Sequence, residues 1–138
     1  MDKLILEIAV DIDGKNVSFL SGTGGEVVMI PFTGTASGEI FNGTVAPGAC
    51  DTQRVNLAGV RHMSARYMLT GKDHTGADCN IFIENNGWFT EMQTPFPTVP
   101  TMLTDSKALA PYLHANHFRG EGHPRDGGVL IKIFEVVK

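Results

Sequence analysis

At 138 residues the chain is long enough to bury one hydrophobic core, and we expect a single domain over residues 1–138. Its 11 Lys and Arg against 15 Asp and Glu give a formal net charge of −4, which argues against nucleic acid as a partner because phosphate binding needs concentrated cations. No apolar run approaches the ~20 residues that span a bilayer, and the first residues lack the form of a secretion signal. We therefore expect a cytoplasmic protein with no membrane partner.

The first half of the chain has the pattern of consecutive β-strands. Four strands are predicted there between turn residues: 4–10, 17–20, 26–32 and 33–45. Three glycines interrupt the last of these strands: Gly34, Gly38 and Gly43. Glycine inside a strand marks a bulge, a bend at a barrel corner or a close backbone approach, so the spacing predicts a small curved barrel.

The second half continues in the same way. Its predicted strands are 60–70, 77–84, 118–122 and 129–137. Prolines between residues 95 and 100 predict an irregular extended segment, because proline cannot donate to a ladder. Only residues 105–114 have helical character, and Pro111 limits that helix to a turn or two. The sequence therefore predicts an all-β fold, a single antiparallel β-barrel with one short helix near residues 105–114.

Several short motifs resemble, in their order and spacing, the bacterial and fungal family called domain of unknown function 3237. They are Gly43-Thr44-Val45, Pro47-Gly48 with Asp51 three residues on, Ala65-Arg66-Tyr67, Ile83 to Gly87, Tyr112-Leu113, Phe118, Gly120, Gly122 and Ile133 to Val136. The similarity runs from residue 26 to residue 137. This resemblance implies a β-barrel with a short helix, and it implies no established biochemical role because the family is largely uncharacterised.

Asp51 and Arg66 are the sharpest candidates for chemistry. An aspartate at a barrel mouth can act as a general base, and a guanidinium can hold an anionic or carbonyl oxygen with two hydrogen bonds. The same two residues can instead form a structural ion pair near the rim, which would shift their pKa values without any function. The sequence leaves both interpretations open.

His62 shares a strand face with Arg66, so it is a candidate acid or base if that face points into the barrel and a surface residue if it does not. Asn85 can orient a ligand or form a turn at the end of a strand. Trp88 and Phe96 can wall a pocket or seal the barrel, and Tyr67 is a further candidate for substrate binding.

No cofactor and no metal are expected. His114, His117 and His123 lack the spacing of a metal-binding helix, and a glycine-rich segment at 21–25 lacks the ending of a phosphate loop. The two cysteines, Cys50 and Cys79, have no zinc-type spacing and are expected to be free thiols.

Two classes of function remain open. One is a cofactor-independent enzyme of the isomerase, hydratase or lyase type, in which Asp51 moves a proton on a small oxygenated substrate and Arg66 holds the oxyanion. The other is a non-catalytic barrel that binds a small ligand or serves as an oligomeric module. An interior filled by residues such as Met63, Tyr67 and Ile81 would favour the second, and an open polar-lined cavity the first.

The C-terminal strand carries apolar residues on both of its faces. Val129, Ile131 and Ile133 alternate with Leu130 and Phe134. One face packs in the barrel, and the other needs a different covering. We therefore expect a homodimer or a higher homo-oligomer, since closed twofold symmetry is the commonest arrangement.

Overall fold

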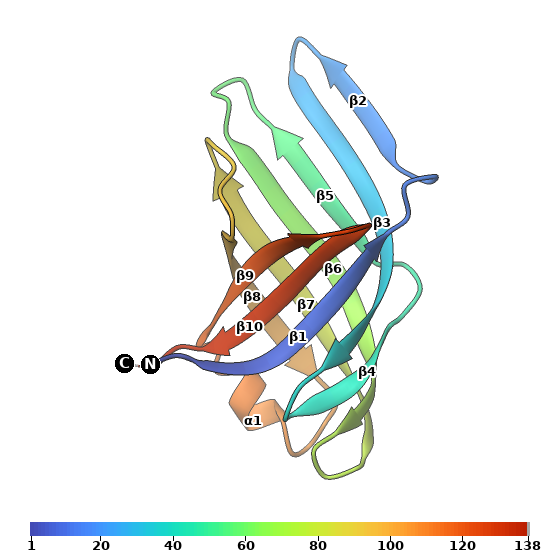
Figure 1. Cartoon of the computed structure of the whole chain (residues 1–138), viewed down its shortest axis with the longest axis vertical. Helices are drawn as coiled ribbons and strands as arrows, with labels where there is room; N and C mark the ends of the chain where they lie inside the picture. The colour runs from blue at the N-terminus through green and yellow to red at the C-terminus, as the bar shows by residue number, and fades with distance from the viewer. Residues whose placement is uncertain (138) are drawn as a thin grey trace.

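The computed structural model describes residues 1–137, and it shows one continuous antiparallel sheet that curls round on itself (Figure 1). The strands are β1 (Lys3–Ile12), β2 (Ser18–Gly22), β3 (Gly25–Ser37), β4 (Phe41–Val45), β5 (Cys50–Val55), β6 (Arg61–Asp73), β7 (Asp78–Phe89), β8 (Phe96–Thr104), β9 (Phe118–Arg125) and β10 (Gly128–Glu135). A short helix, α1 (Ala110–Leu113), follows β8. The predicted all-β fold with one short helix is confirmed.

The sheet closes because β1 has partners on both sides. It pairs with β10 along one edge and with the second half of β3 along the other. The order then runs β10, β9, β8, β7, β6, after which β4 and β5 share one position between β6 and β3. The result is a closed barrel of eight strand positions. The strand β2 pairs only with β3, and this hairpin projects beyond the barrel (Figure 1).

Glycines permit the tight contact between neighbouring strands. A Cβ atom at Gly34 would lie 2.3 Å from the carbonyl oxygen of Ala9, and one at Gly43 would lie 2.2 Å from that of Thr70. No side chain fits at such distances. Of the three roles considered for the interrupting glycines, the structure shows close backbone approach at Gly34 and Gly43.

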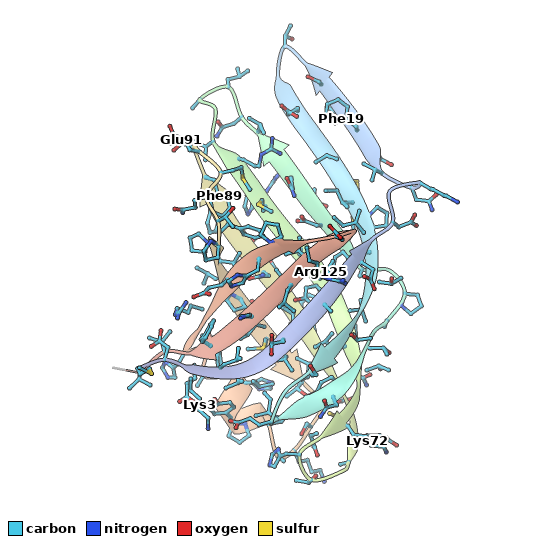
Figure 2. The ribbon with its side chains drawn as sticks, in the orientation of Figure 1. Lys3, Phe19, Lys72, Phe89, Glu91 and Arg125 are labelled. Atoms are coloured by element: carbon cyan, nitrogen blue, oxygen red, sulfur yellow. The ribbon has the colours of Figure 1, made fainter. Side chains whose placement is uncertain are left out.

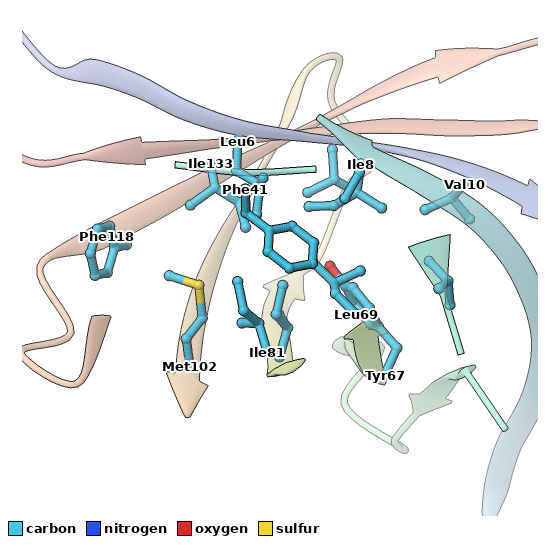
Figure 3. Close-up of a cluster of buried hydrophobic side chains, with 14 of the residues drawn as sticks. Leu6, Ile8, Val10, Phe41, Tyr67, Leu69, Ile81, Met102, Phe118 and Ile133 are labelled. Carbon is cyan, nitrogen blue, oxygen red and sulfur yellow. The ribbon is translucent and has the colours of Figure 1, made fainter. Parts of the chain in front are cut away.

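The lower half of the barrel, at the end that carries α1, is filled with apolar side chains (Figure 3). Phe41 is 1% exposed, and Leu6, Leu69, Ile81 and Ile133 are fully buried. Leu109 and Leu113 close this end from below. Burying side chains of this size stabilises the fold by about 1.5–3 kcal/mol each. This half therefore leaves no space for a ligand.

A single carboxylate organises the turn at the filled end. Asp73 Oδ1 accepts hydrogen bonds from the Thr75 hydroxyl (2.5 Å) and from the backbone N–H groups of Thr75 (2.9 Å) and Ala77 (3.2 Å). Its Oδ2 accepts one from the Ser106 hydroxyl (2.7 Å). These donors favour the charged form and hold the pKa of Asp73 well below its usual range. The β6–β7 turn is thereby tied to the segment that leads into α1.

Several local predictions differ from the structure. The predicted strands 26–32 and 33–45 are instead β3, which runs unbroken through residue 32, and the separate β4, and β5 was not predicted. Residues 85–87 do not end a strand, because β7 continues through them to Phe89. The proline-rich segment is not irregular: β8 is a regular strand that pairs with β9 over 96–98 and with β7 over 99–104, so Pro97 and Pro100 fall where the strand is bonded on one side only. The helix covers only Ala110–Leu113 of the predicted residues 105–114.

Within the described part of the chain, no helix is long and apolar enough to cross a membrane.

The outer face of β10 carries the apolar residues on which the expected oligomer was based. Part of this face is covered within the chain, since the Arg119 guanidinium lies 4.3 Å from the centre of the Phe134 ring. Arg119 is itself held by Asp2 and by Glu121, at 2.5 Å and 2.6 Å. The homo-oligomer stays a prediction.

Replacement of Asp73 by alanine tests the role of this carboxylate at the filled end. We expect Asp73→Ala to lower the free energy of unfolding in urea, because it removes the acceptor of four hydrogen bonds. The loss should shrink as the pH falls below the ordinary aspartate value, since stabilisation by a carboxylate with a depressed pKa is present above that value and disappears on protonation. Asp78→Ala on the same hairpin is the control, because Asp78 pairs only at the surface with Lys72. Equal losses in the two variants would contradict this role.

Candidate functional site

The upper half of the barrel contains a cavity of about 240 Å³. Its walls are mainly apolar and come from both sides of the barrel, with Phe32, Met63 and Ile131 among them. Ile12 and Met92 also line it and are 41% and 60% exposed, so the cavity reaches the surface at this end. Figure 2 shows that the loop bearing Glu91, next to Met92 in the chain, lies at the end opposite Lys72. The barrel interior is thus filled below and hollow above.

The strand register brings a row of polar side chains to the cavity wall. Asp51 of β5 lies opposite Ala65 of β6, and Ala65 lies opposite Asn85 of β7. Side chains directly opposite each other share a face of the sheet, so Asp51 and Asn85 both point inward across the small Ala65. Tyr67 comes two residues further along β6, and Thr98 projects from β8 on the same face. These four polar residues belong to four neighbouring strands.

Each of these residues presents a buried polar atom that has no hydrogen-bond partner within residues 1–137. The atoms are Asp51 Oδ1, Tyr67 Oη, Asn85 Oδ1 and Thr98 Oγ1. A buried polar group is normally paired, and leaving one unpaired costs about 1–3 kcal/mol. Four such atoms around a single cavity indicate a site that lowers the stability of the fold, as functional sites often do.

The carboxylate of Asp51 is oriented by an amide. Gln53 Nε2 donates a hydrogen bond of 2.8 Å to Asp51 Oδ2, and Arg61 Nη1 donates one of 3.0 Å to Gln53 Oε1. Burial raises the pKa of Asp51, while the Gln53 hydrogen bond and the more distant charge of Arg61 act in the opposite direction. Asp51 is therefore held in place through one oxygen, and its other oxygen faces the interior unpaired.

Tyr67 complements Asp51 as a donor. Its ring packs edge-on against Phe32 with the ring centres 5.2 Å apart, and Figure 3 shows it at the edge of the filled core. Burial raises the pKa of Tyr67, and the negative charge of Asp51 raises it further. The phenol consequently keeps its proton at neutral pH and can donate it in a hydrogen bond to a ligand oxygen.

Two glycines on β9 make room for the β8 side chains. A Cβ at Gly120 would lie 2.2 Å from Thr98 Oγ1, and a Cβ at Gly122 would lie 2.0 Å from the Phe96 ring. Phe96 therefore covers Gly122 and lines the cavity, and it also packs edge-on against Phe89 at 6.0 Å. Sequence reasoning missed Thr98 and Gln53. The alternation Phe96, Thr98, Pro100 would have indicated Thr98 if this segment had been recognised as a strand.

The structure does not bring Asp51 and Arg66 together, either as an ion pair or in one pocket. Arg66 lies opposite Cys50, one residue away from Asp51, and neighbouring residues of a strand point to opposite faces. Its side chain is 67% exposed, and its Nη2 lies 3.7 Å from Glu84 Oε2 on the outside of the barrel. Arg66 therefore cannot hold an oxyanion next to Asp51.

His62 and Trp88 also lie on the outer face. The His62 ring stacks on Trp88 with the centres 4.7 Å apart, and its Nε2 is 2.9 Å from Asn86 Oδ1. The alternative in which His62 is a residue of the outer surface is thus the one the structure shows. Of the residues proposed from the sequence, the fold brings Asp51, Tyr67, Asn85 and Phe96 together at the cavity, and it separates Arg66, His62 and Trp88 from them. Within the described chain there is no cluster of three or more His, Cys, Asp or Glu arranged to hold a metal ion.

Comparison with known proteins matches the chain to a family whose description names no activity. The model of a family described as "Protein of unknown function (DUF3237)" matches residues 3–136. A UPF0311 protein of Clostridium acetobutylicum is 34% identical over 84 residues, which are 60% of this chain and 51% of the relative. In that alignment the chain spans about half the length of the curated relative it matches.

Solved structures show the same fold. A protein of unknown function from Clostridium acetobutylicum superposes with a TM-score of 0.80 at 28% identity, covering 99% of both chains. A β-barrel-like protein from Acinetobacter baumannii gives a TM-score of 0.77 at 18% identity, over 97% of this chain and 94% of that one. A conserved protein of unknown function from Rhodopseudomonas palustris gives 0.75 at 22% identity, over 99% and 97%. The last two likenesses concern the fold alone.

The stability of Asp51→Asn tests whether this carboxylate is structural. We expect the variant to be at least as stable as the parent at neutral pH, because its amide oxygen can still accept from Gln53 and no buried cation loses a partner. Breaking a buried ion pair would instead cost about 3–5 kcal/mol. Urea unfolding at neutral pH distinguishes the two results.

The pH dependence of the same variant gives an independent check. A carboxyl whose pKa is raised on folding stabilises the protein below its ordinary value of 3.8, and this contribution is lost as the pH rises through the folded value. The stability of the parent relative to Asp51→Asn should therefore decrease as the pH rises above 3.8. Asp126→Asn, at an exposed carboxylate in the β9–β10 turn, is the matched control. The same slope in both variants would contradict the assignment to Asp51.

Proposed function

Since the chain belongs to the DUF3237 family, whose description carries no activity, we propose a function from its own cavity. The protein binds a small, largely apolar molecule that carries a carbonyl or hydroxyl oxygen, and Asp51 moves a proton on that molecule without a cofactor. The observation behind this proposal is the convergence of four buried, unpaired polar atoms on one apolar cavity.

The size and lining of the cavity define the class of ligand. A volume of 240 Å³ is about eight times the ~30 Å³ that a water molecule occupies in the liquid, and it lies below the range typical of drug-sized ligands. The walls favour an apolar body of about one ring. Asp51 and Asn85 supply acceptors, whereas the hydroxyls of Tyr67 and Thr98 can donate. A cyclic ketone or a hydroxylated ring matches this set.

Isomerisation by proton transfer is the reaction that these groups support best. Asp51 takes a proton from the carbon next to a carbonyl, and the C–H electron pair moves so that the carbonyl oxygen becomes an enolate. The O–H group of Tyr67 donates to that oxygen as its negative charge develops. In a ketone whose β- and γ-carbons are joined by a C=C bond, this enolate is a dienolate, and the protonated Asp51 then returns the proton to the γ-carbon, so that the C=C bond moves into conjugation with the carbonyl. No water, oxidant or second base is consumed.

The electrostatics of the site suit this sequence of steps. A carboxylate with a raised pKa is a stronger base, since proton transfer is most effective when the pKa of the catalyst approaches the working pH. A phenol with a raised pKa stays protonated and remains a donor. A carrier of apolar molecules would have no use for the buried charge of Asp51, which favours an enzyme over a non-catalytic barrel.

Hydrogen–deuterium exchange tests the proton transfer without knowledge of the natural substrate. We expect the protein to accelerate deuterium incorporation at the α-carbon of cyclohexanone in D₂O, followed by NMR. Asp51→Asn should lose about 10²–10⁴-fold of this acceleration, the usual contribution of a general base. Tyr67→Phe should lose about 10²-fold through the missing oxyanion donor, and Asp126→Asn should retain the parent rate. Binding of cyclohexanone without exchange in the parent would instead identify a carrier.

Filling the cavity tests where the ligand binds. Ala65 lies between Asp51 and Asn85, so Ala65→Leu places three additional carbon atoms in the cavity while the carboxylate stays intact. We expect binding of cyclohexanone, measured by saturation-transfer NMR, to disappear in this variant while its circular dichroism spectrum stays that of the parent. Ala58→Leu, at an exposed position in the β5–β6 turn, is the matched control. Unchanged binding in Ala65→Leu would contradict the interior site.

A further inference from the structure

The outer face of β5 and β6 carries a second arrangement of polar groups, on the opposite side of the sheet from Asp51. We propose that it binds a phosphate or phosphoryl group between two arginines. The site is a surface hollow of about 320 Å³ lined by Gly48, Cys50, Thr52, Arg54, Ser64 and Arg66. It is independent of the interior cavity, because alternate residues of the same strands form the two sites.

The strand register defines the geometry of this hollow. Thr52 of β5 lies opposite Ser64 of β6, so their two hydroxyls are neighbours on one rung of the ladder. Arg54 lies two residues beyond Thr52, and Arg66 lies two residues beyond Ser64. Because the strands are antiparallel, the two arginines stand on opposite sides of that rung. A bound anion would therefore have hydroxyls beneath it and a guanidinium group on either side.

Ser64 gives an independent indication that this hollow takes a ligand. The residue is 7% exposed, and its Oγ has no hydrogen-bond partner among the residues that the structure describes. A buried hydroxyl without a partner costs free energy in the free protein. An anionic oxygen seated on the Thr52–Ser64 rung would accept the hydrogen bond that the Ser64 hydroxyl can donate.

Arg54 is fixed in place without losing its charge. Its Nη2 lies 2.7 Å from His62 Nδ1, and since arginine can only donate, His62 Nδ1 accepts this hydrogen bond. His62 Nε2 then carries the hydrogen and donates it to Asn86 Oδ1. Within residues 1–137 no carboxylate lies within ion-pair distance of Arg54, so its charge is not neutralised by the protein.

Arg66 is also available to an anion. Its separation of 3.7 Å from Glu84 is longer than a charge-assisted hydrogen bond, and its side chain is largely exposed. Two guanidinium groups can bind phosphate oxygens in the bidentate manner that makes arginine the preferred partner of phosphate. The two guanidinium groups and the hydroxyls of Thr52 and Ser64 can bind more acceptor oxygens than a carboxylate has. This set of donors therefore favours a phosphoryl group.

A second groove adjoins this hollow between Arg54 and Arg66, and it offers a place for the organic part of a phosphate ester. It has a volume of about 680 Å³, and Arg54 lines both spaces. Leu20, Val27 and Trp88 contribute apolar surface to it, and Trp88 is 58% exposed. An aryl group attached to the phosphate could contact this surface. Inorganic phosphate would bind only in the hollow between Arg54 and Arg66.

Isothermal titration calorimetry with inorganic phosphate and with phenyl phosphate tests the site. We expect both to bind, and Arg54→Gln/Arg66→Gln to weaken each by about tenfold or more, since it removes charge-assisted hydrogen bonds. Lys107→Gln, at an exposed lysine near α1, is the control for lost positive charge and should change neither affinity. Tighter binding of phenyl phosphate would identify an organic phosphate as the ligand, and equal affinities would identify the free anion.

Ser64→Ala separates binding from folding. Removing an unpaired buried hydroxyl should leave the free energy of unfolding unchanged or raise it, whereas phosphate affinity should fall. The site is disproved if millimolar phosphate does not bind the parent, or if Lys107→Gln weakens binding as much as the double arginine variant. It is also disproved if Ser64→Ala binds phosphate as tightly as the parent.

Discussion

Closure of the sheet through β1 is the constraint on which the rest of the structure depends. This strand bonds to β10 on one side and to β3 on the other, so the first and last strands of the chain lie side by side. A closed barrel of eight positions has an interior just wide enough to be filled by side chains or to hold one small ligand. It also fixes the register in which β5, β6, β7 and β8 present their residues to that interior.

The interior is divided by the sizes of the residues that face it. Below, large side chains such as Phe41 and Ile81 meet across the axis and form a dry core. Above, the small Ala65 occupies the inward position between Asp51 and Asn85, and the space that a larger residue would fill remains as a cavity. The core provides stability that the polar cavity does not, so the unpaired atoms of the site are tolerated.

The alternation of the strands lets the same segment present two different sets of side chains. Along β5, Asp51 and Gln53 point inward, whereas Thr52 and Arg54 point outward. The inner face has a buried carboxylate in apolar surroundings, which suits a base acting on a neutral molecule. The outer face concentrates positive charge, which suits an anion. The sheet itself separates charges of opposite sign, Asp51 and Arg54, that lie three residues apart in the chain.

The sequence by itself determined the class of fold. Period-two alternation, interrupting glycines and turn residues are local signals, and they were sufficient for the antiparallel barrel and the short helix. The local sequence does not determine whether a strand residue points inward or outward. A shift of the strand pairing by one residue moves every side chain of that strand to the opposite face. Only the tertiary structure therefore decided that Asp51 meets Asn85 and Tyr67 while Arg66 and His62 lie on the other side. It also decided the place of Thr98, because the regular pairing of a proline-rich strand depends on neighbours distant in the chain.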